Sequence, residues 1–445
     1  MNNRTFAIIK PDAVRNGDTG KIYDRIIKVG FTILSAKLLR MTNAQAEDFY
    51  EGLALALEAI LISPDFIFIV DQREPDPDRP GFDRLDNFSL ASRLSFFLWN
   101  APPDEALLTA AESGDLYDDE TLLRETNRML ASSRLESGMR AFFDDMLGFD
   151  EFNSLAKDPS VYPMVTGSTL RDAREQTLRT IVDHLIVGDS DYRDLFTTRK
   201  TFMSPALGVV YGIPTGNGWT SYVFPDESPR LGILTQVSFL AANSHAVRSS
   251  PTLRGQALRE RFLCQLVPDP PPNVDFSLLE EAENADTARE RLAVHNTNPS
   301  CAGCHLITDP MGLSLENFDG AGRFRETENG SELDISGELD GVFYDDIEGL
   351  ALAVRDHPKL PNCLVNRLFA YSTGGPASLQ HDRDIINWLE NRFVANDYKL
   401  TALLRALIIS KAFSTVRTTD SQGKMGFSES TAEPFRLPEP NFNSL

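Results

Sequence analysis

The stretch "NPSCAGCHLITDPMG" (298–312) places two cysteines and a histidine within a few residues of one another. The spacing Cys301-x-x-Cys304-His305 is the attachment pattern of a c-type haem. Each thiol adds across one vinyl group of the porphyrin, and a helical turn matches the separation of the two vinyls. The adjacent histidine binds the iron through an imidazole nitrogen. The motif therefore predicts one covalent haem c, with His305 as an iron ligand.

Two other kinds of site use the same residue types as this motif. A structural zinc site needs four ligands, and only His295 lies close to the motif in sequence. A redox-active Cys-x-x-Cys pair needs no histidine at all. Both alternatives remain open on the sequence alone.

The residues after the motif are suited to a haem cleft. Apolar contacts are expected from Leu306, Ile307, Leu313, Leu315 and Phe318. The side chains of Arg323 and Arg325 are expected to pair either with haem propionates or with ordinary surface carboxylates.

The second axial iron ligand is less clear from the sequence. His245, in "NSHAVRSSPTLRG", is the preferred candidate, with a purely structural role as the alternative. Met311 follows His305 too closely to reach the opposite haem face, and His357 and His381 are weaker candidates.

Two cysteines remain outside the motif. Cys264 and Cys363 could form a disulfide between the two C-terminal helical segments if the chain is exported to an oxidising compartment. Nothing in the sequence shows that the two residues lie close together.

Composition narrows the class of protein. The chain has 445 residues, 42% of them hydrophobic, which is enough for several globular domains. With 43 basic and 65 acidic residues the net charge is −22, which argues against nucleic-acid binding and against docking on anionic lipid. The most apolar window, 52–70, is interrupted by charges and a proline, so no membrane span is predicted.

The pattern along most of the chain is helical. Helical periodicity is expected at 88–116 (two helices), 118–132, 135–147, 169–188, 287–296, 347–356, 361–372, 382–394 and 399–412. The proline-rich segments 73–87 and 268–274 are predicted to be linkers, and 212–229 a loop.

The first fifty residues differ from the rest. Strands are predicted at 4–14 and 31–42, and helices at 20–30 and 42–50, giving a small β-α-β-α fragment. A further helix is expected at 51–63.

Residues 51–415 resemble the tandem domains of unknown function, numbered 1595, 1592, 1588 and 1585, of planctomycete and myxobacterial secreted cytochrome c-like proteins. The runs "LASRLSFFLWNAPPDEALL", "GILTQVSFLAANSHAVRSSPTLRG", "PSCAGCHLITDPMGLSLENFDGAGRFRE" and "LPNCLVNRLFAYSTG" carry this resemblance. It implies a haem on Cys301 and Cys304, places His245 on the family's Ser-His element, and implies periplasmic or cell-surface location but no established substrate.

Residues 3–50 resemble the start of nucleoside diphosphate kinase, a ferredoxin-like fold, through "RTFAIIKPDAVRNG". The resemblance implies that Lys10 contacts nucleotide phosphates. The family's catalytic histidine motif, Asn-x-x-His-Gly-Ser, has no counterpart in this sequence, and phosphohistidine chemistry requires that nucleophile. Kinase activity is therefore not expected, and the fragment is interpreted as a graft.

The predicted fold class is a mainly α, multi-domain protein. Its segments are a kinase-like fragment (1–50), the end of a helical domain (51–72), a helical domain (84–215), a CxxCH domain (228–330), a C-terminal helical domain (335–415) and a disordered tail (416–445).

The expected function is haem-based electron transfer or oxidation with an unknown redox partner. The alternatives are kinase activity and a non-redox scaffold or glycan-associated module with a structural Cys/His site. The sequence shows no export signal, so the chain as written is expected in the cytoplasm, unlike the proteins it resembles.

Overall fold

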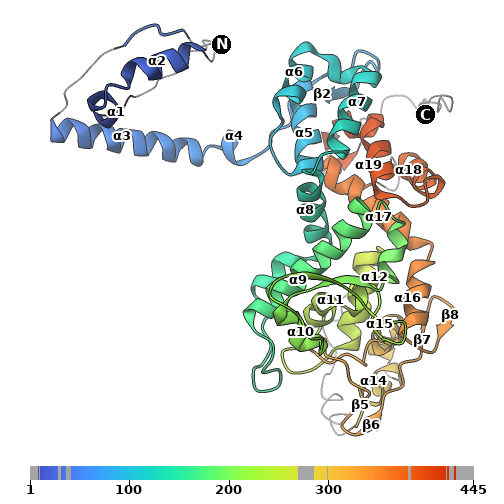
Figure 1. The fold of residues 1–445 in the computed structure, drawn as a ribbon. Helices are drawn as coiled ribbons and strands as arrows, with labels where there is room; N and C mark the ends of the chain where they lie inside the picture. The colour runs from blue at the N-terminus through green and yellow to red at the C-terminus, as the bar shows by residue number, and fades with distance from the viewer. Residues whose placement is uncertain are drawn as a thin grey trace. The chain divides into compact units, whose positions relative to one another are not determined.

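The structure is a computed structural model that describes residues 9, 11–28, 32–36, 42–268, 285–297, 299–378, 382–416, 418–419 and 425–426. The chain divides into two units, Met1–Val70 and Asp71–Leu445 (Figure 1).

The first unit is helical throughout its regular structure. Its described helices are α1 (Pro11–Arg15), α2 (Thr19–Lys28), α3 (Asn43–Leu61) and α4 (Pro64–Ile67). Thr42 caps α3 through a capping box with Gln45, as its position before the helix predicts. The two helices predicted on either side of residue 50 are one continuous helix, so the end of the kinase resemblance lies within α3.

The predicted β-α-β-α fragment is not confirmed. Residues 11–15 are helical where a strand was expected, and residues 32–36 have no regular structure. A strand needs a partner for its backbone groups, and a short fragment of a sheet protein supplies too few. Pro11 also favours the first turn of a helix. Residues 1–8 and 10, and with them Lys10, lie outside the described residues.

The second unit is built mainly from helices, as predicted. Its α-helices are α5 (Asn87–Trp99), α6 (Glu105–Ser113), α7 (Asp119–Leu130), α8 (Leu135–Leu147), α9 (Gly167–Val182), α10 (Pro205–Tyr211), α11 (Val237–Ala242), α12 (Pro251–Phe262), α14 (Ala288–Thr297), α15 (Pro299–Leu313), α16 (Ile347–Arg355), α17 (Lys359–Thr373), α18 (Arg383–Ala395), α19 (Leu400–Ile409) and α20 (Lys411–Ser414). The shorter helical turns are η1 (Asp115–Tyr117), η2 (Phe149–Asn153), η3 (Asp183–Val187), η4 (Tyr192–Phe196) and η5 (Ile233–Thr235).

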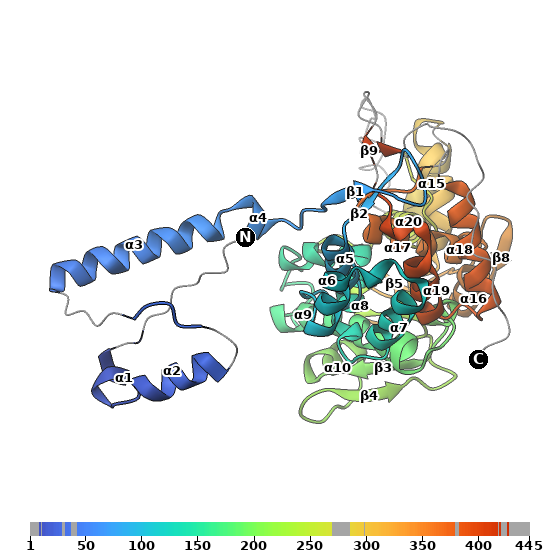
Figure 2. The same cartoon turned by 90° about the horizontal axis from the view of Figure 1, so that it is seen from above.

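The described strands form small antiparallel pairs. The pairs are β1 (Arg73–Pro75) with β2 (Asp83–Leu85), β3 (Lys200–Met203) with β4 (Thr220–Val223), β5 (Thr327–Glu328) with β6 (Ser331–Glu332), β7 (Gly337–Leu339) with β8 (Val342–Tyr344), and β9 (Thr418–Thr419) with β10 (Met425–Gly426) (Figure 2). The predicted linker at 73–87 is thus a hairpin, and the predicted loop at 212–229 contributes a strand.

Aspartates define the starts of several helices. Asp86, Asp104, Asp118 and Asp346 each accept a hydrogen bond from a backbone N–H of the helix that they precede. A carboxylate in this position satisfies an otherwise unpaired N–H and interacts favourably with the helix dipole. Among the described residues, no helix is long and apolar enough to cross a membrane.

Helices α12 and α15 approach each other very closely at two glycines. A Cβ atom on Gly255 of α12 would lie 1.9 Å from the carbonyl oxygen of Thr308, and one on Gly312 of α15 would lie 1.8 Å from that of Pro251. Only glycine leaves room for backbone contact of this kind. The helix that carries the CxxCH motif is therefore held directly against α12.

A disulfide connects this helix pair to the C-terminal part of the unit. Cys264, just after α12, is bonded to Cys363 on α17, with 5.2 Å between their Cα atoms. The two cysteines outside the motif thus form a cross-link over 99 residues of sequence.

Gly255→Ala should lower the free energy of unfolding by at least about 2 kcal/mol, because the new methyl group must push α12 and α15 apart. The matched control is Gly303→Ala, whose Cβ would meet no atom within 4 Å. In the haem-free protein the control should be neutral or stabilising by up to about 1 kcal/mol. Denaturant unfolding measures both, and equal effects of the two substitutions would contradict the packing described here.

Candidate functional site

The CxxCH motif lies on α15, so its two cysteines are one helical turn apart. Cys301 and Cys304 are both partly exposed, and neither is in a disulfide. The sulfur of Cys304 lies 3.4 Å from the carbonyl oxygen of Pro268. Both thiols are therefore available for reaction, whereas Cys264 and Cys363 are consumed by their cross-link.

His305 is oriented by a buried carboxylate. Its Nδ1 lies 2.8 Å from Oδ2 of Asp309, one turn further along α15, and Asp309 is only 2% exposed. The other carboxylate oxygen accepts a hydrogen bond of 2.8 Å from Thr252 of α12. Since a carboxylate accepts, Nδ1 carries the proton and the ring lone pair is on Nε2. This arrangement is typical of metal-binding histidines.

A buried ion pair fixes the segment that follows α15. Arg254 on α12 is fully buried, and its Nη1 lies 3.2 Å from Oε1 of Glu316, which is also buried. Burial lowers the pKa of Arg254 and raises that of Glu316, because desolvation is the largest influence on each. Two buried charges of opposite sign are tolerated only where hydrogen bonds satisfy them further.

Arg254 meets this requirement with backbone carbonyls. Its guanidinium donates to the carbonyl oxygens of Leu315, Phe318 and Asp319 at 2.7–2.8 Å, and to the hydroxyl of Ser244 at 3.1 Å. A single side chain thereby fixes the loop after α15 and also contacts the loop that contains His245.

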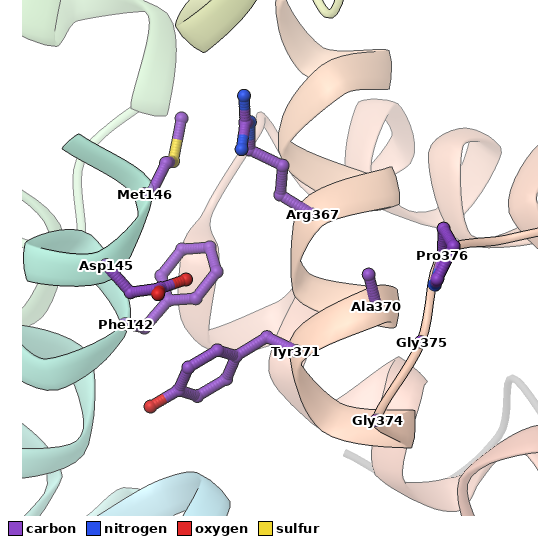
Figure 3. Close-up of a pocket in the computed structure, with 9 residues that line it drawn as sticks. All are labelled: Phe142, Asp145, Met146, Arg367, Ala370, Tyr371, Gly374, Gly375 and Pro376. Atoms are coloured by element: carbon purple, nitrogen blue, oxygen red, sulfur yellow. The ribbon is translucent and has the colours of Figure 1, made fainter. Parts of the chain in front are cut away.

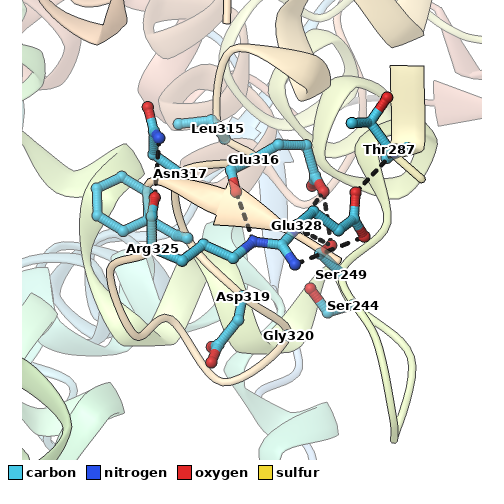
Figure 4. Close-up of polar contacts among 12 residues, drawn as sticks. Ser244, Ser249, Thr287, Leu315, Glu316, Asn317, Asp319, Gly320, Arg325 and Glu328 are labelled. Atoms are coloured by element: carbon cyan, nitrogen blue, oxygen red, sulfur yellow. Dashed lines mark hydrogen bonds and ion pairs between the residues drawn. The ribbon is translucent and has the colours of Figure 1, made fainter. Parts of the chain in front are cut away.

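Glu316 has a second arginine partner. Arg325 donates to Oε2 of Glu316 at 2.8 Å and lies 3.5 Å from Glu328, and Ser249 donates to Glu316 at 2.7 Å (Figure 4). The guanidinium of Arg325 therefore pairs with protein carboxylates. The sequence had left this pairing open as an alternative to haem propionates. Arg323 is exposed, and its backbone N–H donates to Asp319.

The His245 loop is held through its backbone by a segment of the preceding helical region. Lys157 donates to the carbonyl oxygens of Ser244 and His245 at 3.1 and 2.9 Å. The N–H of Asp158 donates to the carbonyl of Ala246, and the hydroxyl of Tyr162 donates to that of Val247. Four successive carbonyls, those of residues 244–247, thus accept hydrogen bonds from residues 157–162.

The side chain of His245 is exposed at this fixed loop. Partial desolvation, together with the positive charges of Arg248 and Lys157, holds its pKa below the ordinary value, which favours the neutral imidazole that can bind a metal. The backbone carbonyl of His245 accepts a hydrogen bond from Lys157, which fixes the loop and not the ring.

The other residues considered as iron ligands have the following environments where the structure describes them. Met311 is fully buried in the core of the second unit. His357 bonds to Asp340 through Nε2 and accepts from the N–H of Lys359 through Nδ1. His381 lies outside the described residues, as does the side chain of His295. Among the described residues, no three His, Cys, Asp or Glu side chains converge into a group that could hold a metal ion.

The donor set fits a covalently attached haem. Two accessible thiols stand one helical turn apart, the space beside Gly303 between them is open, and the ring of the adjacent histidine is oriented through Nδ1 by Asp309. The residues could therefore form two thioethers and one axial bond to iron.

Comparison with known families places this site in one of three matched domains. Residues 85–213 match the protein of unknown function DUF1592, residues 230–328 match DUF1588, and residues 340–413 match DUF1585. The chain carries these three domains in tandem. Residues 3–55 match nucleoside diphosphate kinase. Both predicted resemblances are confirmed. Residues 56–84, which include most of the predicted domain end at 51–72, lie outside these matches.

Several contacts of the site connect the three matched regions. The motif, Arg254 and Glu316 all lie within the DUF1588 match, while Lys157 reaches into it from the DUF1592 match and the disulfide connects it to the DUF1585 match. Contacts from the other two matched regions therefore reach the region that carries the CxxCH helix. No solved structure matches the chain.

Sequence reasoning identified the motif but missed the residues that support it. Asp309 stands four residues after His305, a spacing at which side chains meet on a helix, so this contact could have been inferred. Arg254, Glu316 and Lys157 gave no comparable signal, because charged residues are ordinarily exposed and their partners are distant in sequence.

Arg254→Lys should lower the free energy of unfolding by about 3 kcal/mol, because the single ammonium group of a lysine keeps the charge but cannot span the carbonyls, the hydroxyl and the carboxylate that the guanidinium fork reaches together. Chemical denaturation measures the loss. Arg171→Lys, at an exposed position on α9, is the control and should change stability by less than about 0.5 kcal/mol. Similar small effects at both positions would contradict the role given to Arg254.

Lys157 should make stability depend on pH in the alkaline range. Burial lowers the pKa of Lys157 to about 8, whereas an unfolded lysine titrates near pH 10.4, so the unfolded chain binds more protons between these values. The free energy of unfolding should therefore rise more steeply from about pH 8 to pH 10 in the parent protein than in Lys157→Met. Parallel pH profiles for the two proteins would refute this, and exposed Lys411→Met should follow the parent profile.

Proposed function

We propose that the chain is a c-type haem protein with a role in electron transfer or haem-based oxidation. The single observation that carries the proposal is the state of the four cysteines. Two are paired in a disulfide, and the two of the CxxCH motif remain as accessible thiols beside a histidine oriented by a carboxylate.

The roles of the residues follow from their chemistry. The sulfurs of Cys301 and Cys304 would hold the porphyrin, and Nε2 of His305 would bind the iron. Haem c, when bound, supplies one-electron redox chemistry at its iron. Asp309 accepts from Nδ1 of His305 and thereby fixes the orientation of the ring.

His245 is proposed as the second axial ligand. Its loop is fixed through four carbonyls, its side chain is exposed, and its pKa is lowered, so a neutral imidazole is presented at a defined position. Exposed Arg323 is proposed to pair with a propionate, because the guanidinium of Arg325 is already engaged with Glu316.

The proposal also bears on where the protein matures. A disulfide persists in an oxidising compartment, and CxxCH haem attachment takes place outside the cytoplasm in most bacteria. The haem-bearing form is therefore proposed to be periplasmic or surface-located. Its redox partner is not identified by the site.

Expression of the full chain, with an added export signal, in a bacterium that matures c-type cytochromes should yield covalent haem that resists acid extraction. Cys301→Ala and Cys304→Ala should each leave one thioether, which shifts the pyridine haemochrome band, and the double variant should retain no covalent haem. His245→Ala should keep the attached haem but change the spectrum of its iron.

The matched control is the double substitution Cys264→Ala and Cys363→Ala, which removes two cysteines outside the motif. This control should lose stability but keep covalent haem. A parent protein that is folded by circular dichroism yet carries no haem in the same host would overturn the proposal.

A further inference from the structure

A cavity of about 340 Å³ lies between α8 and α17, remote in sequence from the CxxCH motif (Figure 3). One wall is formed by Phe142, Asp145 and Met146, which share a face of α8. The opposite wall is formed by Arg367, Ala370 and Tyr371 of α17, followed by Gly374, Gly375 and Pro376. Pockets for small ligands commonly have volumes of about 300–1,000 Å³.

The most informative group in this cavity is the guanidinium of Arg367. Its Nη2 donates to the backbone carbonyl of Glu260 at 2.7 Å, but its Nε is buried and has no acceptor among the described residues. Arg367 also lines the cavity, so the charged guanidinium can donate to an oxygen of a ligand placed there. The ligand should therefore present a hydrogen-bond acceptor to Arg367.

The rest of the lining defines what surrounds that acceptor. Phe142 and Tyr371 meet edge to face, with 5.3 Å between their ring centroids, and Met146 and Ala370 add apolar surface. Asp145 is exposed on the same helical face and can accept a hydrogen bond from a ligand. Aromatic rings and a thioether favour a flat, apolar body.

We propose that this cavity binds a neutral phenol, a flat aromatic ring whose hydroxyl groups accept from Arg367 and donate to Asp145. The ring would lie against Phe142, Met146 and Tyr371. This site is separate from the proposed haem function and does not depend on it.

Two other ligand classes fit the lining less well. A sugar ring carries hydroxyl groups around its whole edge, and the described lining offers polar side-chain partners only at Arg367, Asp145 and Tyr371, so several hydroxyls would be buried unpaired. An aromatic carboxylate would satisfy Arg367 but would be repelled by Asp145 and by the net charge of −22.

Ligand-observed NMR titration of the full chain tests the proposal, with and without haem loaded. The probes are the three dihydroxybenzenes under anaerobic conditions, the dimethyl ether of the tightest one, benzoate and methyl glucoside. One dihydroxybenzene should bind saturably, with a dissociation constant near or below about 1 mM. Its dimethyl ether, which has lost the donor for Asp145, should bind at least about fivefold more weakly.

Two substitutions locate the binding. Ala370→Leu fills the cavity and should weaken binding at least about tenfold, whereas Ala395→Leu at an exposed position on α18 should not change it. Asp145→Ala, at an exposed position that is easily tolerated, should weaken the dihydroxybenzene and leave its dimethyl ether unaffected. Absence of saturable binding, binding unchanged in Ala370→Leu, or tighter binding of benzoate or methyl glucoside would each overturn the proposal.

Discussion

The buried pair of Arg254 and Glu316 is the interaction on which the surroundings of the CxxCH helix depend. Taking two charges out of water is expensive, and hydrogen bonds from Arg254 to backbone carbonyls and from Ser249 and Arg325 to Glu316 offset much of that cost, although Nε of Arg254 is buried without an acceptor among the described residues. Since Arg254 lies on α12, the same side chain fixes the loop after α15 and contacts Ser244 next to His245.

The close glycine contacts between α12 and α15 allow Arg254 to reach the segment after α15. Gly255 and Gly312 allow the backbones of α12 and α15 to touch, so that a side chain from one helix can reach the carbonyls that follow the other. Lys157 adds a constraint from the DUF1592 match, and the Cys264–Cys363 disulfide adds one from the DUF1585 match. The region that contains the motif is thus linked to both of the other matched regions, although the residues of the motif belong to one.

Sequence patterns predicted the helical class well, because amphipathic helices repeat their apolar positions locally. The helices predicted at 118–132 and 135–147 correspond to α7 and α8 of the structure. The predicted N-terminal strands were not confirmed, since residues 11–14 are helical and residues 32–36 have no regular structure. The hairpin at 73–85 was missed because a strand depends on partners that local sequence does not reveal.

The candidate site was predictable only in part. Cys301, Cys304 and His305 are adjacent in sequence, so their chemistry could be recognised directly. Arg254 and Glu316 are 62 residues apart, and nothing in their neighbours distinguishes a buried ion pair from two surface charges. The unpaired Nε of Arg367 is likewise a property of packing between α8 and α17 and of no local pattern.

The central claim is that Cys301 and Cys304 carry haem in the mature protein. Mass analysis of the proteolytic peptide that contains residues 299–309, prepared from the native cells after alkylation of free thiols, tests it most directly. The account predicts a peptide that carries one haem and no alkyl group. A peptide that carries two alkyl groups and no haem would contradict it.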